Sequence, residues 1–270
     1  IRDSSTSRWL GDVYKRQDQG YENSIISANI STAFEQYKNI FASLGLGLSY
    51  DDLRTDGSAS SSLRKQTGTF SEIAVNYGFA FDDRDRTFMP TSGSILRFNQ
   101  SLPFYADKSY LDNTLSISTY KTLSENLVGS TKFYITAIEG FNDDNVRLSK
   151  RKGLSSRRLR GFERNKVGPV DSGDHVGGNY ASALNFETNL PNLLPENTKS
   201  VVSLFLDFAN VWGVDYDSSL DDWSKIISST GAVFNFVSPI GPLTFTFSKN
   251  LAKAETDKTE SFTFNLGTSF

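Results

Sequence analysis

The chain has 270 residues, of which 37% are hydrophobic, with 21 Phe, 11 Tyr and no Cys, and its formal net charge is −3. The lack of cysteine excludes a disulfide framework and a Cys-based zinc site. The acidic balance argues against a nucleic-acid partner. No run of 18 apolar residues occurs, so no transmembrane helix is expected, whereas a β-barrel strand needs only about 9–11 residues with one apolar face.

The first seventeen residues, IRDSSTSRWLGDVYKRQ, show neither alternation nor the layout of a signal peptide. The run GDVYKRQ resembles translated sequencing-adapter sequence. We therefore expect residues 1–17 to be a non-native leader or, alternatively, a short disordered native segment. Residues 18–270 are expected to form the C-terminal portion of a β-barrel domain, with no clear second domain.

From about Asn23 onward the dominant signal is alternation with a period of two residues, which is typical of strands with one apolar face. For example, Ile73, Val75 and Tyr77 alternate with Glu72 and Asn76. Together with the turn signals, this pattern predicts eleven strands, at residues 23–37, 39–51, 70–83, 93–104, 109–122, 126–140, 177–190, 199–212, 226–238, 241–249 and 260–270.

Several predicted strands are longer than the usual five or six residues, which suits a strand that crosses a bilayer. The polar face carries charged and amide side chains, whereas a soluble barrel would have an apolar interior. Most connections also alternate in length. They are short or contain Pro near residue 38, at 191–198 and at 239–240, and long at 52–69, 141–176 and 213–225, whereas 84–92 is intermediate. The sequence therefore predicts an all-β fold, an antiparallel transmembrane β-barrel with its polar face inward.

The signals for catalysis and metal binding are weak. His175 is the single histidine and is interpreted as a solvated loop residue, and an enzyme of the outer membrane would need a nucleophile beside a base. No His or carboxylate cluster has the spacing of metal ligands. We therefore predict no enzymatic activity, no catalytic residue, no metal and no cofactor.

A basic segment interrupts the acidic chain, with Arg157, Arg158, Arg160, Arg164 and Lys166 within ten residues. A charge run of this kind is often a solvated surface. By strand parity, however, Glu187 and Asp207 lie on the inward face of neighbouring strands. If the loop folds inward, Arg160 could pair with both carboxylates, with Gly161 allowing a tight turn and Phe162 packing against the wall.

The same segment resembles a known family. Leu159-Arg160-Gly161-Phe162, followed by Val167-Gly168-Pro169, is similar to the Val-Arg-Gly-Phe…Ile-Gly-Pro loop motif of the BamA-type outer-membrane assembly factors. Other stretches resemble the same family in the same order. They are Phe88–Ser94 (FMPTSGS), Gly177–Asn179 (GGN), Phe208–Trp212 (FANVW), Ser238–Leu243 (SPIGPL) and the final strand Phe262–Phe270 (FTFNLGTSF).

The resemblance implies a sixteen-stranded barrel preceded by periplasmic POTRA domains, of which this sequence would hold about the last eleven strands and no POTRA domain. It also implies that Arg160 reaches Glu187 and Asp207 inside the barrel. The last strand resembles the signal by which new barrels are recognised, carried by Phe262, Phe264, Leu266, Gly267 and Phe270.

The function implied by the resemblance is insertion of nascent β-barrel proteins into the bacterial outer membrane, as the core of the BAM complex. Its partners would be outer-membrane lipid, the nascent barrel proteins and accessory lipoproteins. Two alternatives within the same superfamily stay open. These are a TamA-like assembly factor and a two-partner secretion pore.

Overall fold

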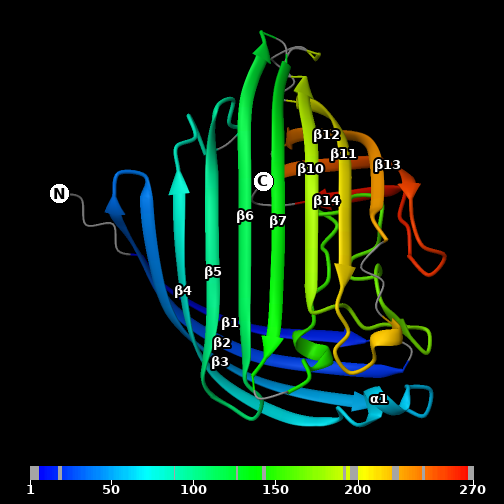
Figure 1. The fold of residues 1–270 in the computed structure, drawn as a ribbon. Helices are drawn as coiled ribbons and strands as arrows, with labels where there is room; N and C mark the ends of the chain where they lie inside the picture. The colour runs from blue at the N-terminus through cyan, green and yellow to red at the C-terminus, as the bar shows by residue number, and fades with distance from the viewer. Residues whose placement is uncertain are drawn as a thin grey trace.

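A computed structural model describes residues 6–17, 20–87, 89–125, 127–141, 144–190, 193–194, 200–220, 225–238 and 241–266. Twelve strands form one antiparallel sheet in the order β1-β2-β3-β4-β5-β6-β7-β10-β11-β12-β13-β14 (Figure 1). Every strand of this sheet is therefore paired with its neighbour along the chain. A small two-stranded sheet, β8 with β9, lies in the connection between β7 and β10.

The strands of the large sheet are long, as the alternation predicted. Their bounds are β1 Thr6–Gln17, β2 Tyr21–Tyr37, β3 Ile40–Thr55, β4 Gly68–Asp82, β5 Gly93–Ala106, β6 Tyr110–Ser124, β7 Leu127–Gly140, β10 Tyr180–Leu190, β11 Ser200–Trp212, β12 Ile227–Ser238, β13 Gly241–Ala252 and β14 Phe262–Leu266. The remaining elements are α1 Ser61–Arg64, β8 Val170–Asp171, β9 Asp174–His175 and the 3-10 turns Leu148–Lys150 and Ser218–Leu220.

Three strands were not predicted from the sequence, namely the two-residue strands β8 and β9 and the first strand of the large sheet. Thr6–Gln17 forms β1, which pairs with β2 from Thr6 opposite Ala33 to Gln17 opposite Glu22. Among the described residues, this corrects the strand count of the large sheet from eleven to twelve and shows a strand where a disordered segment had been one expectation. A strand can pair with the backbone groups of an edge strand without any alternation of apolar and polar side chains. The search for alternation therefore could not detect β1. That the segment is non-native stays a prediction.

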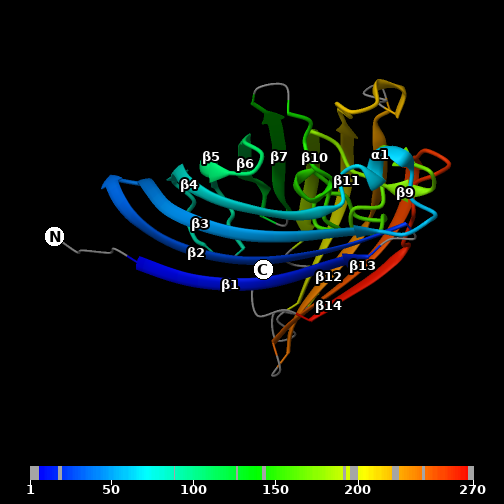
Figure 2. The same cartoon turned by 90° about the horizontal axis from the view of Figure 1, so that it is seen from below.

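The sheet is open, with β1 and β14 as its two edges, and it curls so that one face becomes concave (Figure 2). Opposite residues of antiparallel neighbours share a face, so the register defines an inner and an outer face. Large apolar side chains lie exposed on the outer face, including Leu44 at 54%, Phe79 at 53% and Leu204 at 52%. Such a broad exposed apolar band is the lipid-facing surface of a transmembrane β-barrel.

The connections fall at two ends of the sheet. One end, called here the short-connection end, joins β2–β3, β4–β5, β6–β7, β10–β11 and β12–β13, and the other end carries the long loop between β7 and β10. Among the helices of the described residues, none is both long and apolar enough to span a membrane.

The β4–β5 turn at the short-connection end depends on Gly93 and Asp85. Gly93 has φ +90°, and a Cβ there would lie 2.4 Å from the carbonyl oxygen of Asp83. The Asp85 carboxylate accepts hydrogen bonds from the Thr91 hydroxyl and from the backbone N–H groups of Thr91 and Ser92. These bonds lower the pKa of Asp85 to about 2.

The outer face gives a first prediction. Leu46→Arg places a cation on the lipid-facing row in the middle of β3, and it should weaken folding into bilayers by about 2–4 kcal/mol. Asn76→Arg is the matched control, because Asn76 lies opposite Gly45, next to Leu46, but on the inner face beside a cavity of about 230 Å³. Urea titration of folding into lipid vesicles, followed by heat-modifiable gel mobility, measures both variants. Equal losses would contradict the assignment of the two faces.

Candidate functional site: a loop folded against the inner face

The connection between β7 and β10, described over residues 144–179 and called here the inner loop, lies on the concave side of the sheet (Figure 2). It holds the 3-10 turn Leu148–Lys150 and the strands β8 and β9. Its side chains contact two distant parts of the sheet, β10–β13 on one side and β2–β4 on the other. The predicted site residues 159–162 and 168–169 all belong to this loop.

Arg160 lies between two carboxylates on neighbouring strands. Its Nε and Nη2 donate to the Asp207 carboxylate at 2.8 and 2.7 Å, and its Nη1 donates to Glu187 Oε2 at 2.8 Å. The backbone N–H of Arg160 donates to Asp207 as well, at 3.1 Å. Lys132 Nζ lies 3.4 Å from Glu187 Oε2. Two cations therefore face two carboxylates, and the cluster is close to neutral.

Burial makes this pairing strong. The side chain of Asp207 is 0% exposed and that of Arg160 is 12% exposed. Burial by itself would lower the pKa of Arg160, but the hydrogen bonds and charges of Asp207 and Glu187 outweigh it, so the pKa is raised. The guanidinium also lies 3.9 Å from the centre of the Phe205 ring. Because such a bidentate arrangement depends on the planar fork of arginine, lysine cannot replace it.

Gly161 lets the chain turn directly after Arg160. Its φ is +85°, and a Cβ would lie 3.0 Å from the side chain of Ser248. The carbonyl oxygen of Gly161 accepts hydrogen bonds from Asn250 Nδ2 and from the backbone N–H of Glu260. The loop therefore approaches β13 and the β13–β14 connection closely, and a side chain at position 161 would crowd Ser248 and strain the backbone.

Apolar side chains of the inner loop pack against small residues of the wall. Leu159 and Phe162 are 1% and 2% exposed, and they form one buried cluster with Ala181, Ala183 and Ala209 of β10 and β11. Burying a side chain of this size stabilises the fold by about 1.5–3 kcal/mol. The predicted polar, water-facing inner surface is therefore wrong at this place, because alanines there leave room for the loop.

The inner loop also holds the opposite part of the sheet. Arg147 Nη1 lies 3.2 Å from Asp51 Oδ2 of β3, and both side chains are 3% exposed. The Arg147 guanidinium stacks on the Phe70 ring of β4. Leu148 and Val176 of the loop are buried in a cluster with Tyr21 and Leu53 of β2 and β3.

Further polar contacts join the inner loop to β4, to β6 and to the residue before β2. Lys150 pairs with Glu72 of β4, and Lys152 pairs with Asp112 of β6. Asp174 Oδ1 accepts from the backbone N–H of Gly20 at 3.2 Å. Through these contacts the loop links early strands of the chain to late ones across the concave side of the sheet.

His175 is buried, at 3% exposure, which corrects the interpretation of it as a solvated residue. Its Nε2 lies 2.9 Å from the carbonyl oxygen of Lys166, and its own carbonyl accepts from the Tyr21 hydroxyl. No group of three or more His, Cys, Asp or Glu suited to a metal ion occurs in the described part of the chain.

The other predicted residues also have definite places. Gly168 has φ +90°, and its N–H donates to Asp257 Oδ1 at 3.3 Å. The carbonyl of Pro169 accepts from the N–H of Val176. Of the last-strand residues, Phe262, Phe264 and Leu266 are 47%, 50% and 57% exposed, whereas Gly267 and Phe270 lie outside the described residues.

Sequence reasoning missed Arg147 and Asp51. Asp51 stands at an inner-face position of β3, and an unmatched carboxylate at such a position was the one available signal. Arg147 lies in an irregular part of the loop where parity gives no direction. The pair could therefore not be assigned before the loop was placed.

The Arg160 cluster gives a second prediction. Arg160→Ala should lower the free energy of unfolding by about 3–5 kcal/mol, because it leaves the buried Asp207 carboxylate without its cation. Arg157→Ala is the matched control, since Arg157 is an exposed arginine of the same loop. Urea unfolding of the purified protein in vesicles measures both. Equal stability of the two variants would show that the buried pairing adds nothing.

The Arg147–Asp51 pair gives a third prediction. Asp51→Ala should destabilise the protein by about 3–5 kcal/mol, because the Arg147 charge stays buried without its partner. The double variant Arg147→Leu with Asp51→Leu should recover most of this loss, since two apolar side chains can replace a buried pair. A double-mutant cycle measures the coupling. Strictly additive effects of the single variants would contradict the pairing.

Comparison with known proteins agrees with this architecture. The chain is 25% identical over 256 residues to the outer membrane protein assembly factor BamA of Neorickettsia risticii, covering 93% of this chain and 34% of that protein. It is 28% identical over 138 residues to the human sorting and assembly machinery component 50 homolog, covering 49% of this chain and 29% of that protein. The chain thus spans about a third of the length of these relatives.

Among solved structures, BamA from Haemophilus ducreyi lacking POTRA domains 1–3 superposes with a TM-score of 0.83 at 22% identity, covering 96% of this chain and 57% of that one. CdiB from Acinetobacter baumannii gives a TM-score of 0.59 at 12% identity, covering 91% and 42%. Residues 3–270 match the Omp85 superfamily domain, and the chain therefore belongs to the Omp85 superfamily.

Proposed function

We propose that this chain forms the barrel of a factor that assembles β-barrel proteins into a bacterial outer membrane. The observation that carries the proposal is the way the inner loop holds the connection that leads into the edge strand β14. Backbone bonds run from Glu163 N–H to the Lys258 carbonyl, from Lys258 N–H to the Lys166 carbonyl and from Glu260 N–H to the Gly161 carbonyl.

An edge strand has one row of backbone N–H and C=O groups without partners in its own sheet. An incoming extended segment can pair with such a row and so add a strand. In this chain the loop fixes where β14 begins, while β14 pairs with β13 alone among the described strands. The substrate in this proposal is an unfolded barrel protein, and strand pairing supplies the free energy without a nucleotide.

The named relatives support this proposal. The BamA of Neorickettsia risticii is an outer membrane assembly factor, and the human homolog is a component of a sorting and assembly machinery. The nascent barrel proteins, the surrounding outer-membrane lipid and accessory lipoproteins are the partners that we propose by this likeness. A TamA-like factor would act by the same chemistry.

A two-partner secretion pore of the same superfamily is the alternative, and the observation that bears on it is the position of the inner loop on the concave side of the sheet. In a pore the inner loop would act as a plug, and ion conductance would be the main activity. An insertase should accelerate folding of an added barrel protein, whereas a pore should mainly conduct ions.

A fourth prediction separates the two functions. The intact protein, reconstituted in vesicles, should accelerate folding of an added, urea-unfolded barrel protein relative to empty vesicles, as read by heat-modifiable mobility. Conductance of the same preparation in planar bilayers should stay low, because the loop occupies the inner face. High conductance without accelerated folding would favour the pore and sink the assembly proposal.

A further inference from the structure

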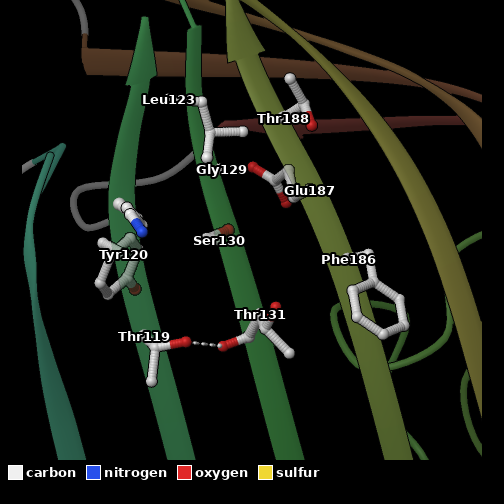
Figure 3. Close-up of a pocket in the computed structure, with 10 residues that line it drawn as sticks. Thr119, Tyr120, Leu123, Gly129, Ser130, Thr131, Phe186, Glu187 and Thr188 are labelled. Carbon is white, nitrogen blue, oxygen red and sulfur yellow. Dashed lines mark hydrogen bonds between the residues drawn. The ribbon is translucent and has the colours of Figure 1, made fainter.

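A cavity of about 530 Å³ lies on β6, β7 and β10 (Figure 3). Glu187 points inward to Arg160, so its sequence neighbours Phe186 and Thr188 point outward. Most lining residues belong to the two cross-strand rows that contain Phe186 and Thr188 and therefore lie on the outer face. Phe186 and Thr131 stand on the near side of the strands in Figure 3, and Leu123 lies over Gly129. The rows are Thr119, Thr131 and Phe186, and Lys121, Gly129 and Thr188.

The hollow comes from missing side-chain volume in the lipid-facing surface. Gly129 has no side chain, and Thr131 beside it is short. Phe186 and Leu123, which are 41% and 56% exposed, form apolar walls. A Cβ on Gly129 would lie 3.0 Å from the Leu123 side chain, so Leu123 is the nearest wall. A volume of this size falls in the usual range of small-molecule sites.

Among the described lining residues of this groove, Lys121 is the one cation. It is exposed, and it lies near the end of β6 at the short-connection end of the barrel. A lysine on the lipid face is destabilising at the middle of a bilayer but nearly neutral close to the bilayer surface. The position of Lys121 therefore fits the level of the headgroups, where a phosphate can reach its ammonium.

We propose that the groove binds one anionic phospholipid, with an acyl chain along Gly129 and Thr131 and the phosphate on Lys121. The groove lies on the face of the barrel that is surrounded by lipid. The positive charge of Lys121 favours a lipid with an anionic headgroup. Glu187 also contributes to the lining, but its carboxylate is neutralised by Arg160 and Lys132, and its side chain belongs to the other face of the same strands. The proposal is independent of the assembly function.

The test uses the intact protein in nanodiscs that contain equal amounts of phosphatidylglycerol and phosphatidylcholine with the same acyl chains. Native mass spectrometry then identifies the lipid that is retained. The expected result is one retained phosphatidylglycerol. Lys121→Gln should reduce its preference over phosphatidylcholine about fivefold, the effect of a single lysine at a membrane surface. Gly129→Leu, which fills the groove, should reduce retention of both lipids.

Lys38→Gln is the matched control, because Lys38 is an exposed lysine in the β2–β3 turn at the same end of the barrel. It should leave retention unchanged. Equal losses in the Lys38 and Lys121 variants would overturn the proposal, since they would reflect general surface charge. Displacement of the lipid by inorganic phosphate, or retention of lipopolysaccharide instead, would overturn it as well. Heat-modifiable mobility shows which variants are folded, and Lys121→Arg should keep the wild-type preference.

Discussion

The structure depends above all on how the charge of the buried Arg160 is balanced by carboxylates. Arg160 belongs to a loop, whereas its partners Glu187 and Asp207 belong to two adjacent strands. A guanidinium away from water is stable only where several carboxylate oxygens meet its fork. Both strands must therefore hold their register for the loop to stay in place. The loop in turn fixes the register between β10 and β11, which backbone hydrogen bonds alone would allow to slip.

The second consequence concerns the curvature of an open sheet. Each strand is paired only with its neighbours, so the ladders specify local twist but not the distance between β3 and β11. The inner loop reaches both, through Arg147 to Asp51 and through Arg160 to Asp207. Apolar clusters at each attachment add burial to these charges. A loop attached at two places limits how far the sheet can flatten.

Much of this architecture could be predicted from residue types, because period two is a direct consequence of strand geometry. Parity also placed Glu187 and Asp207 on the inner face before Arg160 was located between them. The strand β1 escaped this reasoning, since its residues show no alternation. The partner of Asp51 escaped it too, because Arg147 follows no period. The burial of His175 depends on β2 packing against the loop, which no local pattern encodes.

One part of β13 pairs with β14 and another part contacts the inner loop, so the loop supports the edge of the sheet. Leu243–Phe247 pair with β14, whose aromatic residues Phe262 and Phe264 lie beside Phe247 and Phe245 at ring-centre distances of 5.1 Å. Beyond this stretch, Asn250 donates to the carbonyl of Gly161. Where the partner strand ends, the loop takes up polar groups of β13. Any change that withdraws the loop would therefore free the end of β13 next to the edge strand and remove a support for the register of β14.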